Sequence, residues 1–385
     1  MELPRLAVVC DYREENWPSM DLVADMLLED LRRDYAGTIR ATRLAPSMRR
    51  RFTREGTRDG ELFKADRLLN RFWDYPRFLR RERAQFDLFH IIDHSYAQLV
   101  HSLPPEKTVI TCHDLDTFRS LLNGETERRS PLFKRMTRRI MSGLGKAARV
   151  TCDSVATRDE LLAHELVAPE RAVVVPNGVH PSCTPEADPL ADDEATRLLG
   201  GSRAMEATEI LHVGSCIRRK RIDVLLRVFA AVRKEFASAR LVRVGGPFTY
   251  EQRRLAEQLD IAGSIVVLPH LDRDVLAAVY RRAAVVVLPS EREGFGLPVV
   301  EALACGAAVV ASDLPVLHEV GGAAALYCAV GDLKAWTQSI TRLLIERGCE
   351  PQQWSARRAA GIAQASKFSW AEYAGKMMAV YEQLL

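Results

Sequence analysis

Residues 289–306 read PSEREGFGLPVVEALACG, and this order predicts the end of a strand, a loop and a helix. The apolar run Ala284–Leu288 just before them is typical of a strand that is buried on both faces of a parallel sheet. Gly294 and Gly296 allow the loop backbone conformations that other residues avoid, and Pro298 suits the first turn of a helix. The stretch therefore predicts an α/β fold in which a buried strand delivers a loop to a helix N-terminus.

The start of the predicted helix combines an anion site with two acids. Backbone amides at a helix N-terminus and the helix dipole attract phosphate, and flanking glycines let a phosphate come close. Glu293 and Glu301 cannot bind phosphate, but carboxylates accept hydrogen bonds strongly from sugar hydroxyls. A nucleotide sugar offers both kinds of group, so the pattern favours such a ligand. The alternative is that both acids are simply solvated at the start of a helix.

The run Glu-Gly-Phe-Gly-Leu-Pro-x-x-Glu at residues 293–301 closely resembles the signature of the family 4 retaining glycosyltransferases, with seven fixed residues in a row of nine. The resemblance implies the GT-B architecture, in which two Rossmann-like domains face an interdomain cleft. It also implies that Glu293 binds hydroxyls of the donor sugar and that Glu301 binds the ribose. The other donor-binding residues of this loop would be Gly294, Phe295, Gly296 and Leu297.

A further strand, basic turn and helix are predicted between Glu209 and Asp223. Lys220 and Arg219 match the family pattern Val-Gly-Arg-x-x-x-Arg-Lys-Gly, whereas Ser215 stands where the pattern has an arginine. The resemblance implies that Lys220, with Arg219, stabilises the departing diphosphate without a divalent ion. The alternative is a solvated surface turn. More donor-binding residues are expected here and downstream, namely Gly214, Ser215, Gly245 and Leu268.

His113 follows the predicted strand Thr108–Cys112, at the carboxyl end where ligands bind in open α/β sheets. The family resemblance places a histidine near the donor sugar at this point, so we predict a catalytic role for it. The alternative is a strand-end histidine that is satisfied by neighbouring backbone. Asp114-x-Asp116 also matches the metal-binding D-x-D of a different glycosyltransferase class. Because three residues match by chance often, we predict no metal site.

The composition of the 385 residues bounds the class of protein. Hydrophobic residues make up 47%, which is enough for two or three domains with their own cores. Lys and Arg number 54 against 51 Asp and Glu, and a net charge of +3 gives no sign of nucleic-acid binding. The 8 cysteines show no metal-ligand spacing and suit a reducing cytoplasm. With no signal-peptide pattern and no apolar run of about 18 residues, we expect a cytoplasmic protein.

The segment 48–86 is locally basic and aromatic. It holds 12 Arg and Lys against 6 acids, interleaved with Phe, Trp and Tyr. Such a segment could dock on an anionic membrane surface, which would place the protein at the inner face of the membrane, or bind a phosphorylated acceptor. The alternative is a solvated helical hairpin with aromatics in the core and arginines in water.

The order of predicted strands and helices suggests how the domains are arranged. We expect an acceptor-binding Rossmann-like domain at 1–185 and a nucleotide-sugar-binding one at 186–365. The turn signal Pro-Asn-Gly at 176–178 closes the first half, and a Pro- and Asp-rich linker follows. As in relatives, the helix predicted in 366–385 would cross back to the first domain.

The resemblance implies a reaction that moves a sugar from a nucleoside diphosphate to an acceptor hydroxyl, with retention of configuration and without cofactor or metal. Lys220, Glu293 and His113 are the predicted catalytic residues, and the acceptor is not identified. Two alternatives from other classes stay open. One is a sugar-nucleotide epimerase or hydrolase of the same architecture, and the other is a nucleotide-sugar-binding protein without catalysis, which the intact Lys220, Glu293 and Glu301 argue against.

Overall fold

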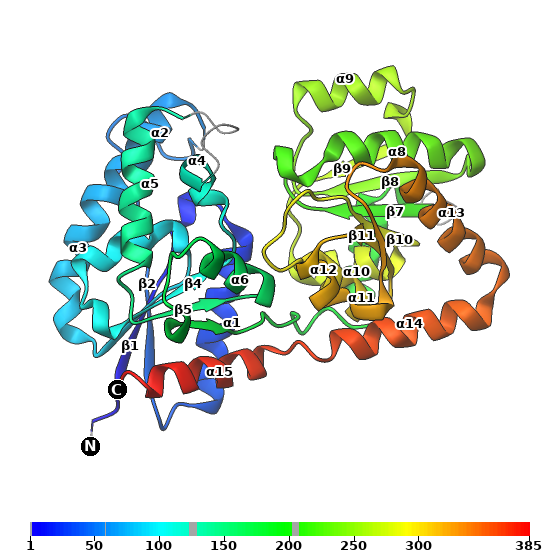
Figure 1. The fold of residues 1–385 in the computed structure, drawn as a ribbon. Helices are drawn as coiled ribbons and strands as arrows, with labels where there is room; N and C mark the ends of the chain where they lie inside the picture. Colours follow the sequence, from blue (N-terminus) through cyan, green and yellow to red (C-terminus); the bar gives the residue numbers. More distant parts are fainter. Residues whose placement is uncertain (1, 58, 123–128, 202–207) are drawn as a thin grey trace. The chain divides into compact units, whose positions relative to one another are not determined.

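The computed structural model describes residues 2–57, 59–122, 129–201 and 208–385. The chain divides into two units, Met1–Gly178 with Trp370–Leu385, and Val179–Ser369. Each unit is built around one parallel sheet that is flanked by helices (Figure 1). The predicted fold class, two Rossmann-like α/β domains, is thereby confirmed.

The first unit contains a six-stranded parallel sheet, called sheet A, with the strand order β2-β1-β3-β4-β5-β6. The order reverses between β1 and β3, so the sheet has a switch point there. Its strands are β1 Arg5–Val9, β2 Arg40–Leu44, β3 Leu88–Ile91, β4 Thr108–Cys112, β5 Arg149–Cys152 and β6 Ala172–Val174. Its helices are α1 Pro18–Asp34, α2 Glu61–Leu69, α3 Tyr75–Glu82, α4 Arg119–Leu122, α5 Pro131–Leu144, α6 Val155–Ala163 and α15 Trp370–Glu382.

The second unit contains sheet B, also six-stranded and parallel, with the order β12-β11-β10-β7-β8-β9. Here the order reverses between β7 and β10. Its strands are β7 Thr208–Val213, β8 Ala239–Val244, β9 Ile265–Leu268, β10 Val285–Leu288, β11 Ala308–Ser312 and β12 Leu326–Cys328. Its helices are α7 Pro189–Leu198, α8 Ile222–Glu235, α9 Tyr250–Gln258, α10 Arg273–Arg282, α11 Leu297–Ala304, α12 Pro315–Gly321, α13 Leu333–Cys349 and α14 Pro351–Ala365.

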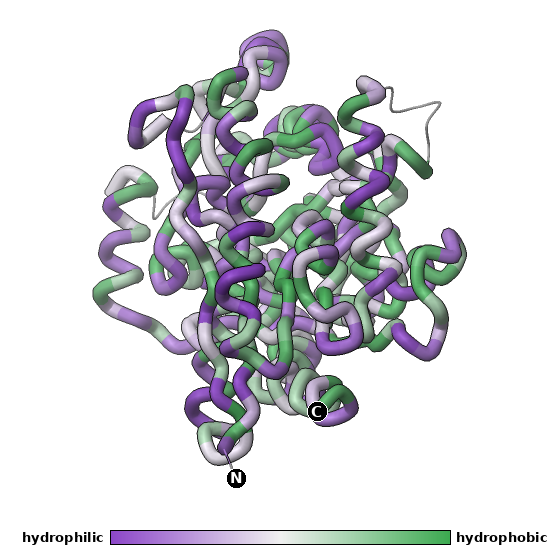
Figure 2. The backbone as a smooth tube through the Cα atoms, turned by 90° about the vertical axis from the view of Figure 1, so that its left-hand side faces the viewer, coloured by the Kyte–Doolittle hydropathy of each residue, from purple (hydrophilic) through white to green (hydrophobic). Residues whose placement is uncertain are grey.

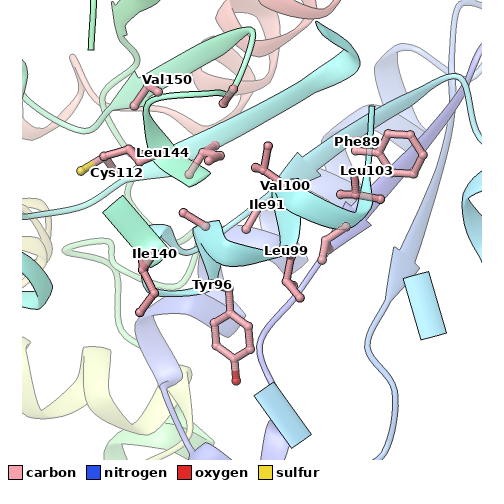
Figure 3. Packing of buried hydrophobic residues seen from close by; sticks show 14 of the residues in the cluster. Phe89, Ile91, Tyr96, Leu99, Val100, Leu103, Cys112, Ile140, Leu144 and Val150 are labelled. Atoms are coloured by element: carbon pink, nitrogen blue, oxygen red, sulfur yellow. The ribbon is translucent and has the colours of Figure 1, made fainter. Parts of the chain in front are cut away.

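Each sheet packs on its helices through a hydrophobic cluster of its own. In the first unit, Ile91 of β3 and Leu144 of α5 belong to a cluster that also holds Leu99 and Val100 (Figure 3). In the second unit, Trp336 of α13 is fully buried in the other cluster. Hydrophilic and hydrophobic residues alternate along many helices in Figure 2, as expected where one helix face meets a core and the other meets water.

The domain boundaries that we expected at 185 and 365 can be set beside the observed division. The first unit ends at Gly178, within the predicted Pro-Asn-Gly turn. Helix α15 belongs to the first unit, where it packs on α1. There the Tyr381 hydroxyl lies 2.7 Å from Nδ1 of the buried His90. The acceptor and donor roles of the two units stay predictions.

Two local predictions from the sequence need correction. The amphipathic pattern of residues 20–33 predicts a helix with Ser19 as its N-cap. However, α1 begins at Pro18, because proline is pre-organised for the first helical turn. The segment 48–86 does not form a hairpin: α2 continues into α3 through one π-helical turn. Phe63 and Tyr75 are buried there as the alternative predicted, but Phe52 and Trp73 are exposed. One basic residue of this segment, Arg58, lies outside the described residues.

Candidate functional site

In the loop after β10, Gly296 adopts the left-handed backbone that the sequence predicts, whereas Gly294 does not have a positive φ. Gly296 has φ 98° at the N-cap of α11, and a Cβ atom there would lie 2.6 Å from a methyl group of Leu317. Pro298 occupies the first turn of the helix. Phe295 is buried, and its ring packs edge to face on that of Phe368, with 5.7 Å between the centroids. The first amides of α11 therefore start from a rigidly held loop.

The side chain of Glu293 is only 6% exposed and lies between two cations from the turn after β7. Lys220 Nζ donates to its Oε1 at 2.6 Å, and Arg219 Nη1 donates to its Oε2 at 3.3 Å. Burial would raise the pKa of Glu293, but the charges of Lys220 and Arg219 outweigh burial and lower it. Glu293 is therefore an ionised carboxylate, and it fixes the position of the buried Lys220 ammonium.

The strand order explains why these residues meet. Because β10 pairs with β7, the loop after β10 lies beside the turn after β7. A backbone hydrogen bond of 2.7 Å from Glu291 to Arg219 joins them, and Arg219 donates to the Arg292 carbonyl at 2.8 Å. The switch point of sheet B thus carries a cluster of two cations and one carboxylate, the kind of place where open α/β sheets bind ligands.

Glu301 has a different environment from Glu293. It is buried within α11, and its Oε2 accepts a hydrogen bond of 2.9 Å from the Tyr280 hydroxyl. Burial raises the pKa of Glu301 to about 7, although the Tyr280 hydrogen bond and the charge of Arg273 act in the opposite direction. Glu301 therefore exchanges its proton near neutral pH, whereas Glu293 stays charged.

Two glycine loops complete this end of sheet B. A Cβ atom on Gly245, which follows β8, would lie only 2.3 Å from the carbonyl oxygen of Gly214, which follows β7. The amides of Gly245 and Gly246 both lie 3.3 Å from the Leu268 carbonyl of β9. The structure therefore brings three of the predicted donor-binding positions, 214, 245 and 268, side by side. Ser215, which follows Gly214, is partly buried.

His113 belongs to the first unit, directly after β4, where the sequence placed it. Nδ1 lies 2.6 Å from Oδ2 of Asp153, and Nε2 lies 2.8 Å from the Ile92 carbonyl. Burial would lower the pKa of His113, but the Asp153 charge dominates and raises it to about 9. The ring is therefore an imidazolium that donates from both nitrogens to protein groups. Its contact with a donor sugar stays a prediction.

The Asp114-x-Asp116 motif is used locally. Oδ1 of Asp114 accepts a hydrogen bond of 2.9 Å from the Asp116 amide, and Asp116 lies 3.7 Å from Arg119. Within the described ranges, no group of three or more His, Cys, Asp or Glu residues is arranged to hold a metal ion.

Sequence reasoning missed two buried polar residues near the Lys220 cluster. His212 on β7 has no hydrogen-bond partner on either ring nitrogen within the described chain. Burial lowers its pKa to about 3, helped by the charges of Arg243 and Lys220. Arg243 on β8 is also fully buried. A charged or polar residue within the apolar runs ILHV of β7 and LVRV of β8 was the available signal for both.

A pair of acids at the switch point of sheet A was missed as well. Asp11 follows β1 and Asp93 follows β3, and both are buried. Burial, and next the Asp93 charge, raise the pKa of Asp11 well above its usual range. Burial opposes ionisation of Asp93 too, but the charges of His94 and His113 lower its pKa. Their position after apolar strands was the signal in the sequence.

Sequence comparison assigns the family. Residues 201–360 match the family described as Glycosyl transferases group 1, and residues 29–182 match Glycosyltransferase Family 4. The chain belongs to this glycosyltransferase family. Both units contain a matched segment, so the resemblance first seen in residues 293–301 extends over most of this family 4 member.

One relative of this glycosyltransferase family member is the D-inositol 3-phosphate glycosyltransferase of Thermobispora bispora. The two are 30% identical over 292 residues, which cover 72% of this chain and 65% of the relative. The chain thus spans slightly less than two thirds of the relative's length.

Solved glycosyltransferase structures share the fold. Sucrose-phosphate synthase from Thermosynechococcus elongatus superposes with a TM-score of 0.77 at 20% identity, covering 99% of both chains. HepE of Anabaena, in complex with UDP and glucose, has a TM-score of 0.73 at 15% identity and covers 98% of this chain and 99% of its own. These similarities confirm the GT-B fold. None of the helices in the described ranges is long and apolar enough to cross a membrane.

Proposed function

We propose that the protein is a retaining glycosyltransferase that moves a sugar from a nucleoside diphosphate to an acceptor hydroxyl without a metal ion. The observation that carries this proposal is the Lys220–Glu293 pair with Arg219, beside the N-terminus of α11. The complex of the structural neighbour HepE with UDP and glucose supports a nucleotide sugar as the donor.

In this reaction the diphosphate leaves, and its negative charge grows as the bond to the sugar breaks. The enzyme must stabilise this charge. An ammonium has three N–H donors, and one from Lys220 binds Glu293. The others can meet diphosphate oxygens together with Arg219 and the first amides of α11, which stabilise the developing charge. This arrangement supplies in protein groups what a divalent ion would otherwise supply.

The two glutamates take different roles in the proposed donor complex. Glu293, ionised and held by Lys220, accepts hydrogen bonds from hydroxyls of the donor sugar. Glu301, within α11, accepts one from the ribose. A retaining glycosidase needs two close carboxylates, one of them a nucleophile. Because Glu293 is neutralised by two cations and Glu301 is buried against Tyr280, we do not propose either as a nucleophile.

The acceptor site is proposed to belong to the first unit. The name of the Thermobispora bispora relative makes D-inositol 3-phosphate the first acceptor to test. However, Asp11, Asp93 and Asp114 gather after β1, β3 and β4, and carboxylates there favour the hydroxyls of an acceptor over its phosphate. We therefore expect an unphosphorylated polyol or sugar to compete well in such a test.

A further part of the proposal concerns location. All 8 cysteines carry free thiols, in keeping with a reducing cytoplasm. The exposed Phe52 and Trp73, with Arg77 stacked 3.7 Å from the Trp73 ring centroid, support contact of the segment 48–86 with an anionic membrane surface. Asp74 weakens this surface because it pairs with Arg51 at 2.8 Å.

A thermal-shift screen across nucleotide sugars tests the proposal. A true donor at a hundred times its dissociation constant should add about 2.7 kcal/mol to the folded state. NMR of the product with acceptor should then show an unchanged anomeric configuration, in the presence of EDTA. Hydrolysis or epimerisation of the donor without acceptor would favour a hydrolase or an epimerase. Binding without turnover would favour a nucleotide-sugar-binding protein without catalysis.

A further inference from the structure

Arg243 is a charged residue in the interior of sheet B. It lies on β8, in the run LVRVGG, and β8 runs between β7 and β9 (Figure 1). The residue is 0% exposed to solvent. Arginines are almost never fully buried unless they are paired, so this one calls for a physical reason.

The guanidinium of Arg243 binds carbonyls of both glycine loops. Nη2 donates to the Gly214 carbonyl at 2.6 Å and lies 3.3 Å from that of Gly245, and Nη1 donates to that of Gly246. Gly214 follows β7, whereas the other two glycines follow β8. A single cation therefore joins the two loops to which we assign donor contacts.

Among the described residues, the charge of Arg243 has no acidic partner. Within the described part of the chain, no carboxylate forms an ion pair with it, and Phe248 lies beneath the guanidinium at 5.4 Å from the ring centroid. The other arginine of β8, Arg240, pairs with Glu209 at 2.9 Å. Because an unpaired buried cation is unfavourable, the retained charge of Arg243 suits a site that binds an anion.

The surroundings add further positive charge. Burial lowers the pKa of His212 to about 3, and the next two causes are the charges of Arg243 and Lys220, so His212 is neutral and lies near both. The ionised groups here are Arg243, Lys220, Arg219 and Glu293. Three cations and one carboxylate leave two positive charges, which matches the charge of a diphosphate ester.

The hydrogen bond from Arg243 to the Gly214 carbonyl also sets the direction of the next backbone N–H, that of Ser215. In a trans peptide the C=O and the following N–H point in opposite directions. Because the Gly214 carbonyl points toward Arg243, the Ser215 amide points away from the guanidinium. Ser215 has no charge of its own, so its contribution to anion binding would come from this amide.

We infer that Arg243 is a positioning residue for the donor diphosphate, acting through the peptide of Gly214 and through its unpaired charge without touching the ligand. The inference rests on the proposed function, because it requires a diphosphate at these loops. It deepens that function by adding a third cation, in the interior of the sheet, to Lys220 and Arg219.

The test measures binding of UDP and GDP, and of uridine and guanosine, by titration calorimetry. Arg243→Met removes the charge and keeps the volume, Arg243→Lys keeps the charge, and Arg240→Met is a matched control on the same strand. We expect Arg243→Met to weaken binding of the nucleoside diphosphate by about ten- to thirtyfold and binding of the nucleoside by less than twofold. Arg243→Lys should stay within about threefold of wild type, and Arg240→Met should not change either affinity.

Several results would overturn the inference. One is a folded Arg243→Met variant that binds the diphosphate like wild type, and another is an equal loss for nucleoside and diphosphate, which indicates a structural role alone. If Arg243→Met does not fold, Arg243→Lys decides: a loss above tenfold would overturn the inference, and near-wild-type affinity would support it. A wild type that binds neither UDP nor GDP would overturn the proposed function itself, and this inference with it.

Discussion

The switch points of the two sheets have the same topology and opposite chemistry. In sheet B, the turn after β7 and the loop after β10 bring Lys220 and Arg219 to the single carboxylate of Glu293. In sheet A, the residues after β1 and β3 are the acids Asp11 and Asp93. The strand framework therefore fixes where a ligand can bind, and the side chains after the strands decide the charge of that ligand.

The two clusters also handle charge differently. Around sheet A, burial and the Asp93 charge raise the pKa of Asp11, and the imidazolium of His113 offsets Asp153 at 2.6 Å. The charges of His94 and His113 lower the pKa of Asp93. The cluster therefore compensates its charge internally. Around sheet B, the positive charges of Lys220 and Arg219 outnumber the one negative charge of Glu293, and Arg243 adds another positive charge. Only the second cluster keeps charge available for an anionic ligand.

Removing the central cation of sheet B should give the largest effect. We expect Lys220→Ala to lower kcat by about 10²–10³-fold, with a smaller change in donor affinity, because the ammonium gains strength as charge builds on the leaving oxygens. Steady-state kinetics with EDTA present measure this, and Arg218→Ala, an exposed neighbour on the same turn, is the control. If Lys220→Ala keeps activity within a few-fold of wild type, or if EDTA abolishes wild-type activity and Mg²⁺ restores it, a metal ion stabilises the leaving group.

The pairing of the His113 charge with Asp153 in the first unit can be tested by measuring stability against pH. The pKa of His113 is about 9 in the fold and about 6.5 unfolded, so the folded state binds the extra proton between these values. This stabilisation is complete below pH 6.5 and is lost as the pH rises through 9, by about 3 kcal/mol. Asp153→Asn should flatten this slope.

Urea unfolding of wild type and Asp153→Asn at pH 6 and pH 9.5 measures the difference. Asp114→Asn is the matched control, because Asp114 lies 3.7 Å from His94, whereas Asp153 lies 2.6 Å from Nδ1 of His113. An equally steep slope in Asp153→Asn would show that His113 does not owe its proton to Asp153.

Glu301→Gln should weaken binding of the bare nucleoside diphosphate by about 1.5–3 kcal/mol, the value of a hydrogen bond to a charged group. Because the pKa of Glu301 is about 7, the carboxylate gains a proton as the pH falls from 8 to 6, and wild-type affinity should decrease over this range. Calorimetry at both pH values tests this, with the partly buried Glu291 as the control position for the same substitution. Unchanged affinity in Glu301→Gln would contradict the ribose assignment.

The smallest effect concerns a surface outside both switch points. Replacing Arg49, Arg50, Arg51 and Arg54 by Ala should reduce sedimentation with anionic liposomes, at roughly 1 kcal/mol per basic residue. The loss should be smaller for Arg51, which already pairs with Asp74. Neutral liposomes are the control. If the wild-type protein does not sediment with anionic liposomes at low salt, the proposed contact of the segment 48–86 with a membrane is wrong.

Local patterns predicted the elements that carry the donor site. The apolar run before residue 289, Gly296 and Pro298 correctly predicted β10, the loop and α11, because they act on the backbone of their own neighbourhood. The same reasoning failed at Ser19, since the helix had already started at Pro18. It also did not anticipate the helix that continues through residues 70–74, because a π-helical turn leaves no clear pattern in a single sequence.

The sequence by itself determined the fold class, the family and which polar residues follow the strand ends. Only the tertiary structure decided which of these residues meet. Lys220 and Glu293, 73 positions apart, pair because β10 lies beside β7, and Arg243 reaches Gly214 because β8 lies on the other side of β7. Strand order depends on the packing of the whole sheet. The contacts that set the pKa of Glu293, and those that leave Arg243 without an acid among the described residues, therefore have no local signature in the sequence.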